Sequence, residues 1–381
     1  MIKMKRTTMN LSIVAAAVLS VILSAQPLDA GPPVKVFILA GQSNMVGAGR
    51  VEGDSSRNEG KGSLSYLAEN DPKYEHLRTG SGKWVGRDDV SIWFLGRKGE
   101  LAPGFGSNGG TIGPELGFGH VVGDAFDVPV LLIKIAWGGK SLAKDFRPPS
   151  AGGEVGPFYT EMFTHVKEVL GNLKKEFPKY RSGYEMVGFG WHQGWNDGCD
   201  MAASREYEEN LGNFIRDVRQ ELGVEKLPFV IADSGFGGES QSNDRRLMIR
   251  AAQAAPAKSR EFKGNVICVE TESFFRPAEE SPSNQGYHWN GNAETYYLIG
   301  EAMGQAMVEL AGTAAPREPT PAPVHVFRSA DGSKTFKGRL QGYDTATKKV
   351  TVRRENGRVI TFDLHHLHPD DQEFVTSGGR G

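Results

Sequence analysis

Residues 34–45 read VKVFILAGQSNM, and this stretch carries the strongest fold signal in the 381-residue chain. It opens with a largely apolar run that is too short for a helix and that ends at Gly41. Such a run, ended by glycine, is typical of a strand buried on both faces of a parallel sheet. The chain then turns into Ser43 and Asn44, so we expect a serine hydroxyl at the carboxyl end of this strand.

Similar apolar runs alternate with amphipathic segments along the next part of the chain. The runs occupy residues 128–136, 184–190, 227–232 and 265–269. The segments with a helical period occupy residues 159–177, 204–222, 244–258 and 293–310. Alternating strands and helices predict an α/β fold, a three-layer αβα sandwich whose parallel sheet is covered on both sides. Ligands of such sheets bind beyond the carboxyl ends of the strands.

A proline-rich stretch predicts where this main domain ends. Residues 313–323 are rich in Ala, Pro, Thr and Glu, which is typical of a stiff extended linker. We therefore expect one large domain over residues 31–312. Residues 324–376 alternate apolar and polar side chains, with the turn signals Asp331-Gly332 and Asn356-Gly357. This pattern predicts a small all-β barrel.

The N-terminus has the composition of an export signal. Three cations at positions 3–6 precede an apolar run at residues 11–23 that is short for a membrane span. We expect residues 1–30 to be a signal peptide and the protein to be secreted or periplasmic. Neither Ala25 nor Ala30 has a small residue at the position that signal cleavage normally requires, so an uncleaved anchor is the alternative. No other segment is long and apolar enough to span a membrane.

The net charge of the chain indicates which class of molecule it binds. Lys and Arg total 44 against 46 for Asp and Glu, and a net charge of -2 gives no field that would gather nucleic acid or an anionic membrane. We expect a neutral or small solute instead. Cys199 and Cys268 are the two cysteines. Export would permit a disulfide, but Cys268 lies in an apolar run and equally suits a buried free thiol.

Residues 51–111 show no clear period and are rich in Gly, Asp and Arg. A long loop inside a compact domain is usually functional, so we expect a substrate-facing excursion here. Its aromatic residues, such as Trp84, Trp93 and Phe105, would stack on a substrate or pack in the interior.

The turn at Ser43 has features of a catalytic site. A serine is a nucleophile only where a base accepts its proton and N–H groups stabilise the oxyanion that forms on the substrate. A sharp turn after a strand exposes both the hydroxyl and free amides. The alternative is an ordinary turn in which Ser43 caps a helix.

Three later turns favour the catalytic interpretation. Residues 135–141 contain Gly138 and Gly139, which permit close approach of the backbone to a ligand. Residues 191–197 contain two side-chain amides, and residues 285–291 contain a histidine directly before the last predicted helix.

Taken in this order, the four turns resemble those of the SGNH hydrolase superfamily, specifically its sialate O-acetylesterase and acetylxylan esterase branch (carbohydrate esterase family six type). The resemblance covers residues 34–310 and implies a flavodoxin-like parallel sheet. It implies that Ser43 is the nucleophile and His288 the base. It also implies an oxyanion hole built from Gly138 or Gly139 with the Gln193 amide.

Two positions depart from the branch. Trp195 stands where the branch often has Glu, and the run Gly194 to Asp197 matches the wider superfamily's Gly-x-Asn-Asp form, which makes Asn196 the reserve oxyanion donor. The superfamily commonly has Asp three residues before the histidine, but that residue is Gln285 here. A Ser-His dyad would then be completed by a backbone carbonyl, or by Glu279 or Glu280.

The function that these features predict is cofactor-free and metal-free hydrolysis of an O-acetyl ester on a carbohydrate, of the sialate or plant and algal polysaccharide type. The alternative is a carbohydrate-binding or surface-adaptor protein that keeps the fold without turnover. Gly139-Lys140-Ser141 lacks the earlier glycine of a phosphate loop. Glu115, after Gly113-Pro114, is expected to be a structural charge in the first turn of a helix.

The C-terminal region is similar to the Sla-type homology domain, an SH3-like barrel. The similarity lies in residues 327–332, 350–352 and 359–361, and it implies binding of a peptide or polymer, with a purely stabilising role as the alternative. His365, His366 and His368 cluster there, but no Cys or carboxylate spacing completes a metal site, so a polar strand end is the expected role.

Overall fold

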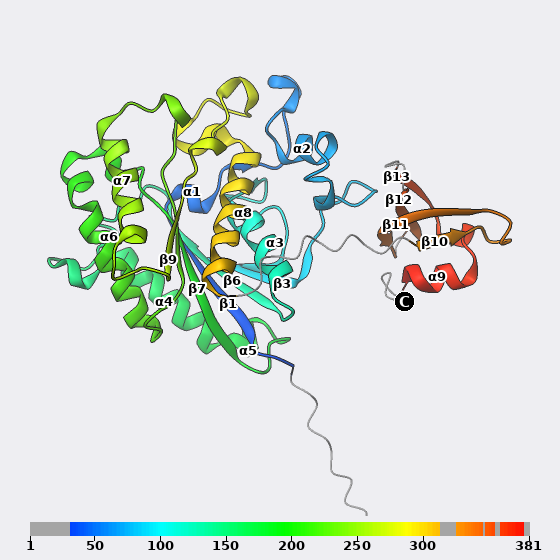
Figure 1. The fold of residues 1–381 in the computed structure, drawn as a ribbon, viewed down its shortest axis with the longest axis horizontal. Coiled ribbons are helices and arrows are strands. Elements are labelled where there is room, and N and C mark those ends of the chain that lie inside the picture. The colour runs from blue at the N-terminus through cyan, green and yellow to red at the C-terminus, as the bar shows by residue number, and fades with distance from the viewer. Residues whose placement is uncertain (1–30, 313–324, 346, 355–358, 377–381) are drawn as a thin grey trace, which may run out of the picture. The chain divides into compact units, whose positions relative to one another are not determined.

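The computed structural model describes residues 31–312, 325–345, 347–354 and 359–376. The expected signal (1–30), the expected linker (313–323) and the turn Asn356-Gly357 lie outside the described residues. Figure 1 draws the chain as a ribbon.

The main part is built on a seven-stranded sheet in the order β4-β3-β6-β1-β7-β8-β9. Its strands are β1 Val34–Gly41, β3 Arg87–Phe94, β4 Arg97–Leu101, β6 Val130–Ala136, β7 Tyr184–His192, β8 Phe229–Ala232 and β9 Val266–Val269. Neighbouring strands are parallel except for β3 and β4, which form an antiparallel hairpin at one edge. The five apolar runs of the sequence form β1, β6, β7, β8 and β9, so the predicted parallel sheet is confirmed. These five lie in the flavodoxin-like order β6-β1-β7-β8-β9.

Helices cover both faces of this sheet (Figure 1). The helices of the main part are α1 Ser43–Val46, α2 Leu64–Asn70, α3 Glu115–Ala125, α4 Pro157–Gly171, α5 Leu173–Glu176, α6 Met201–Leu222, α7 Asp244–Lys258 and α8 Ala293–Leu310. Val36 and Ile38 of β1 pack in one cluster with residues of α4, α6 and α7. Phe37 and Leu39 pack in a second cluster with residues of α3 and α8. Since side chains alternate along a strand, β1 contributes to both clusters.

Glycines let α3 and α8 approach closely. A Cβ atom on Gly300 would lie 1.9 Å from the Pro114 carbonyl oxygen, and one on Gly117 would lie 2.2 Å from the Tyr297 carbonyl oxygen.

The prediction of a loop excursion over residues 51–111 is wrong for much of that segment. It contains α2 and the hairpin β3–β4, which extends the sheet beyond β6. The apolar run in β3 is short and charged residues flank it on both sides, which hid its strand character. Trp93 is 6% exposed and packs in the core. The end of the segment pairs as β5 (Thr111–Ile112) with β2 (Gly49–Arg50).

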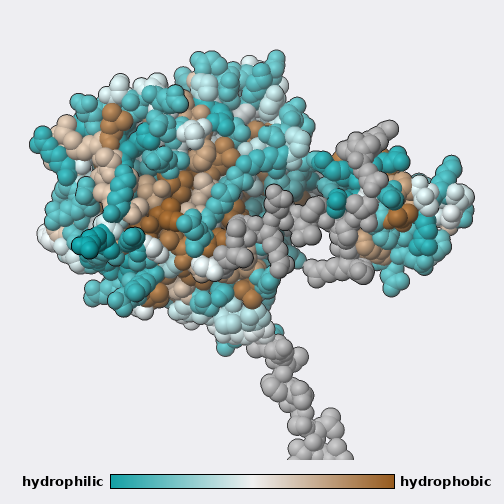
Figure 2. Space-filling model, viewed as in Figure 1, coloured by the Kyte–Doolittle hydropathy of each residue, from teal (hydrophilic) through white to brown (hydrophobic). Residues whose placement is uncertain are grey.

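The other edge of the sheet is β9. Its Ile267, Cys268 and Val269 side chains are half-buried. Figure 2 shows hydrophobic side chains between α7 and α8, where this strand runs. Both cysteines are free thiols. No helix among the described residues is long and apolar enough to cross a membrane.

The C-terminal part forms a four-stranded antiparallel sheet followed by a helix. Its elements are β10 His325–Arg328, β11 Thr335–Asp344, β12 Lys349–Arg354, β13 Val359–Asp363 and α9 Pro369–Thr376. The all-β prediction is therefore wrong in one respect, because α9 packs Val375 into the hydrophobic cluster of the strands. Pro369 at the first position and Asp370 and Asp371 in the first turn favour a helix here.

Candidate active site

β1 ends in a tight turn that brings Ser43 to the carboxyl end of the sheet. Gly41 has a φ of +154°, and a Cβ atom there would lie 2.1 Å from the carbonyl oxygen of His192 at the end of β7. Only glycine fits between these two strand ends. The chain then enters α1, and the Ser43 amide donates no hydrogen bond to any described residue. The first amides of a helix have no partner within it, so this N–H is available to a ligand.

A pocket of about 370 Å³ lies beside this turn. Ser43, Gly138 and His288 line it together, although they come from three distant segments of the chain. Among the lining residues of the described chain, Arg50 is the only one with a formal charge, and none is an aspartate or glutamate. The structure thus brings the predicted nucleophile, base and one of the two candidate glycines into one cavity.

Of the two glycines, Gly138 faces the pocket. Its amide donates no hydrogen bond within the described residues, and nothing lies within 4 Å of the position that a Cβ would take. Gly139 does not line the pocket. Its φ is +68°, and its carbonyl oxygen accepts a hydrogen bond from Asn196 Nδ2 at 2.5 Å.

His288 lies in the turn η8 (Gly286–Gly291), whose backbone is unusual. Trp289 and Asn290 have φ values of 50° and 55°, a region that residues other than glycine rarely adopt. Two interior contacts fix the conformation of the turn. The Trp289 side chain is fully buried, and Asn290 Nδ2 donates to the Arg276 carbonyl oxygen at 3.0 Å. Strain of this kind persists only where the surroundings enforce it, and it clusters at functional sites.

Asn44 and Tyr296 connect the serine turn to the histidine turn. Asn44 Nδ2 donates to the Tyr287 carbonyl oxygen at 3.0 Å, and the Tyr296 hydroxyl donates to Asn44 Oδ1 at 2.7 Å. The same hydroxyl lies 3.3 Å from the His288 carbonyl oxygen. Both connecting side chains are buried. Sequence reasoning assigned neither a role, because their contact joins residues that are 252 positions apart.

Burial lowers the pKa of the half-buried His288 imidazole, and no charged group or hydrogen bond from the described residues opposes this shift. His288 is therefore neutral at neutral pH, the state in which an imidazole accepts a proton. Gln285 also lines the pocket, and its carbonyl oxygen accepts the His288 amide at 2.8 Å. Glu279 and Glu280 are exposed in η7 (Ala278–Glu280) and do not line the pocket.

Gln193 is buried and does not line the pocket. Its Nε2 atom lies 2.6 Å from Asp197 Oδ2, 3.0 Å from the Lys140 carbonyl oxygen and 3.2 Å from Gln42 Oε1. The Tyr207 hydroxyl donates to Gln193 Oε1 at 2.8 Å. Two amide hydrogens thus face three acceptors, so the side chain already uses its donors within the protein.

The reserve donor, Asn196, also lies outside the lining of the pocket. Besides the contact of its side chain with Gly139, its amide N–H donates to Gln42 Oε1 at 3.2 Å. Gln42 Oε1 accepts the Gly194 amide as well, at 3.0 Å. Gln42 thereby connects the serine turn to the turn after β7, a role that the sequence did not reveal.

Asp197 binds the segment that directly follows the turn at residues 135–141. Its carboxylate accepts the amides of Leu142 and Ala143, each at 2.9 Å, in addition to Gln193. Burial raises the pKa of Asp197 to about 6, although these donors favour its charged form. The sequence pattern contained Asp197 but gave no reason to expect this function.

A buried ion pair lies behind the serine turn. Lys134 Nζ of β6 is 2.6 Å from Glu115 Oε2, and it also donates to the carbonyl oxygens of Val46 and Phe105 at 2.7 and 2.8 Å. Both charged side chains are almost completely buried. Glu115 opens α3, so it is the structural charge that its position predicts.

In the described part of the chain, one group of side chains has the geometry of a metal site. It consists of Asp363, His365 and His366 of the C-terminal part. Sequence reasoning found the histidines but no carboxylate beside them, whereas the structure places Asp363 there.

Comparisons with known proteins indicate the family of the chain. Residues 33–309 match the model of the family described as carbohydrate esterase, sialic acid-specific acetylesterase. The probable carbohydrate esterase At4g34215 of Arabidopsis thaliana is 24% identical over 246 residues, which cover 63% of this chain and 80% of the relative.

A solved structure shares the fold. The structure of the same Arabidopsis protein superposes with a TM-score of 0.50 at 19% identity and covers 74% of this chain and 100% of its own. XAC1771, a carbohydrate acetylesterase from Xanthomonas citri, has a TM-score of 0.45 at 14% identity, covering 84% of this chain and 62% of that one. Because the family model spans most of the chain, the protein belongs to the family of carbohydrate esterases, sialic acid-specific acetylesterases, and is a carboxylic ester hydrolase.

Proposed function

We propose that this carbohydrate acetylesterase works by serine catalysis through an acyl-enzyme, with Ser43 as nucleophile and His288 as base. The observation that carries the proposal is the shared pocket of Ser43, Gly138 and His288. The lowered pKa of His288 supports it, because a base must be unprotonated at the pH where it works.

The reaction proceeds in two halves. Ser43 Oγ attacks the acetyl carbonyl carbon, its proton moves to His288, and the carbonyl oxygen becomes an oxyanion. His288 then gives the proton to the sugar oxygen as the C–O bond breaks, which leaves acetyl-Ser43 and a free hydroxyl on the sugar. Water attacks the acetyl group in the second half, His288 takes a proton from this water and returns it to Ser43 Oγ, and acetate leaves.

The oxyanion is held by the backbone amides of Ser43 and Gly138. Both amides are free of partners among the described residues. The Gln193 and Asn196 amides are already bonded to Asp197 and Gly139, so we assign them to positioning the turns that carry these donors. Preorganised donors of this kind are often the largest single contribution to catalysis of acyl transfer.

The catalytic group is a Ser-His dyad. Gln285 occupies the place of the orienting acid and cannot carry a negative charge, and the pocket lining of the described chain holds no carboxylate. Connections through Asn44 and Tyr296 orient the histidine turn instead. The acyl ester is carried by a sialate or by a plant or algal polysaccharide.

Three serines line the pocket, which provides an internal control: Ser43, Ser107 and Ser283. We expect Ser43→Ala to lower the rate of acetate release from O-acetyl sialic acid or acetylated xylan by about 10⁴-fold or more. Ser107→Ala and Ser283→Ala should retain most of the wild-type rate. A Ser43→Ala protein that releases acetate at the wild-type rate would exclude the mechanism.

We further propose that residues 1–30 direct export and that residues 324–376, joined by the linker at 313–323, form an SH3-like module that binds a peptide or polymer. The cations and apolar run of the N-terminus support export. The antiparallel sheet β10–β13 supports a small β module. Fractionation of expressing cells would test the first part, and recovery only from the cytoplasm would oppose it. Sequencing the N-terminus of the exported protein would distinguish a cleaved signal from an uncleaved anchor.

A further inference from the structure

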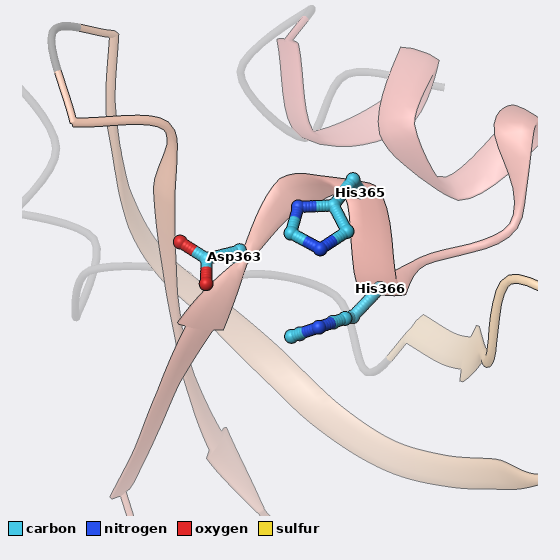
Figure 3. A group of neighbouring side chains, drawn as sticks. All are labelled: Asp363, His365 and His366. Carbon is cyan, nitrogen blue, oxygen red and sulfur yellow. The ribbon is translucent and has the colours of Figure 1, made fainter.

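The turn after β13 places two imidazoles beside a carboxylate (Figure 3). Asp363 ends β13, and His365 and His366 belong to the next turn, η9 (Leu364–His366). One potential ligand atom from each of the three side chains lies within 4.8 Å of the other two. The two imidazole rings are 4.2 Å apart between centroids. One ion can therefore contact all three side chains after small changes of rotamer.

The backbone of this turn is held on both sides. The Leu364 amide donates to the Lys348 carbonyl oxygen at 2.8 Å, and the Ala330 amide donates to the His366 carbonyl oxygen at 2.9 Å. Leu367, directly after the turn, is 2% exposed in the hydrophobic cluster of this part. The apolar residues of the turn thus face inward and the three polar ones face outward, on a fixed backbone, which is the support that a ligand set needs.

The ring nitrogens of the two histidines make no hydrogen bond or ion pair within the described part of the chain. The C-terminal part contains two other histidines, and each has a carboxylate partner: His325 Nε2 lies 2.9 Å from Asp371, and His368 Nδ1 lies 3.4 Å from Asp370. His365 and His366, by contrast, are exposed, and neither ring makes a hydrogen bond or ion pair with a described residue. Their nitrogens are therefore available to an ion.

Asp363 has one free ligand atom. Lys349 Nζ lies 3.0 Å from its Oδ1 atom, which leaves Oδ2 to complete the set. The lysine also opposes a cation electrostatically, so the affinity of the site falls below what the three ligands alone would provide.

We propose that Asp363, His365 and His366 bind a divalent first-row transition metal ion, with Zn²⁺ as the ion that fits best. Imidazole nitrogens favour zinc, nickel and copper over calcium and magnesium, which prefer oxygen ligands. Three protein ligands leave at least one position for water or for a donor from a bound molecule. The proposal is independent of ester hydrolysis, which we assign to Ser43 and His288.

The test uses the full-length protein, stripped with a chelator and then titrated with Zn²⁺ by calorimetry and with Co²⁺ by visible absorption. We expect one equivalent to bind. His365→Ala, His366→Ala and Asp363→Asn should each weaken binding by about tenfold or more. His368→Ala is the matched control, since this nearby histidine is already paired with Asp370, and it should bind as the wild type does.

Lys349→Met provides a variant expected to gain affinity, because it removes the opposing charge from Asp363. All five side chains are at the surface or half-buried, and circular dichroism confirms folding before titration. Absence of Zn²⁺ binding by the wild type would overturn the proposal. So would equal binding by the wild type and by folded His365→Ala and His366→Ala proteins, or a Lys349→Met protein that binds no more tightly than the wild type.

Discussion

At the scale of single residues, His288 and Gln193 differ in whether their side-chain nitrogens are available to a substrate. His288 is half-buried in the pocket wall, and its imidazole nitrogens make no hydrogen bond or ion pair with a described residue. Gln193 is fully engaged with Asp197, Lys140 and Tyr207. His288 is thus free to exchange a proton. Gln193 instead connects the segments that surround the site.

Burial lowers the pKa of His288 below its ordinary value of 6.5. A general base works only in its neutral form, so kcat/KM should stay constant on acidification until the pH reaches this lowered pKa, and should then fall. We expect the acidic limb of the pH profile of kcat/KM to have its midpoint below pH 6.5. A midpoint above this value would mean that a negative charge stabilises the imidazolium, contrary to a dyad.

Gln193→Ala separates positioning from oxyanion binding. The variant removes the Gln193 side-chain hydrogen bonds to the buried Asp197 carboxylate and Tyr207 hydroxyl, which should lower the free energy of unfolding by about 1–3 kcal/mol. Urea unfolding measures this loss beside kcat. A Gln193→Ala protein with wild-type stability and a kcat lowered by about 10²-fold or more would show that the amide contacts the oxyanion after all.

At the scale of elements, the site depends on contacts between turns rather than on any one turn. Asn44 of α1 bonds to the turn η8, and Tyr296 of α8 bonds to Asn44. The serine and histidine turns are therefore connected through buried side chains that do not line the pocket.

Tyr296→Phe should test this connection. It keeps the buried ring but leaves Asn44 Oδ1 unpaired, so we expect a loss of about 1–3 kcal/mol in unfolding free energy and a lower kcat with little change in KM. Tyr297→Phe is the matched control, because the Tyr297 hydroxyl makes only a long contact of 3.4 Å with His76 Nε2. Equal kcat values for the two variants would contradict the assigned role.

Sequence reasoning found the elements whose signal is local. The apolar runs predicted β1, β6, β7, β8 and β9. The turns after two of them contained Ser43 and Gly138, and the turn before the last helix contained His288. It missed β3 and β4, since their short apolar stretch is flanked by charges. It also could not decide between Gln193 and Asn196 as oxyanion donors. Their bonding partners come from distant segments, and local spacing does not encode such contacts.

At the scale of the whole molecule, the buried Lys134–Glu115 pair joins the centre of the sheet to α3 and to the serine turn. A buried ion pair contributes little net stability, but removing one partner leaves an isolated charge. We therefore expect the loss of one partner to lower the stability of the whole main part.

Lys134→Met should lower the unfolding free energy by about 3–5 kcal/mol, because the buried Glu115 charge then has no opposite charge beside it. The double variant Lys134→Met/Glu115→Gln should recover part of this loss. Urea unfolding of the single and double variants measures both effects. A double variant less stable than Lys134→Met would show that the remaining Glu115 charge is not the cause.

The central claim is that Ser43 is the residue that becomes acylated, and covalent labelling tests it most directly. After reaction with a serine-directed fluorophosphonate, peptide mass spectrometry should find one adduct, on Ser43. The adduct should be absent from Ser43→Ala, strongly reduced in His288→Ala, and unchanged in Ser107→Ala and Ser283→Ala. An adduct on Ser107 or Ser283 in the wild type, with Ser43 unmodified, would contradict the account.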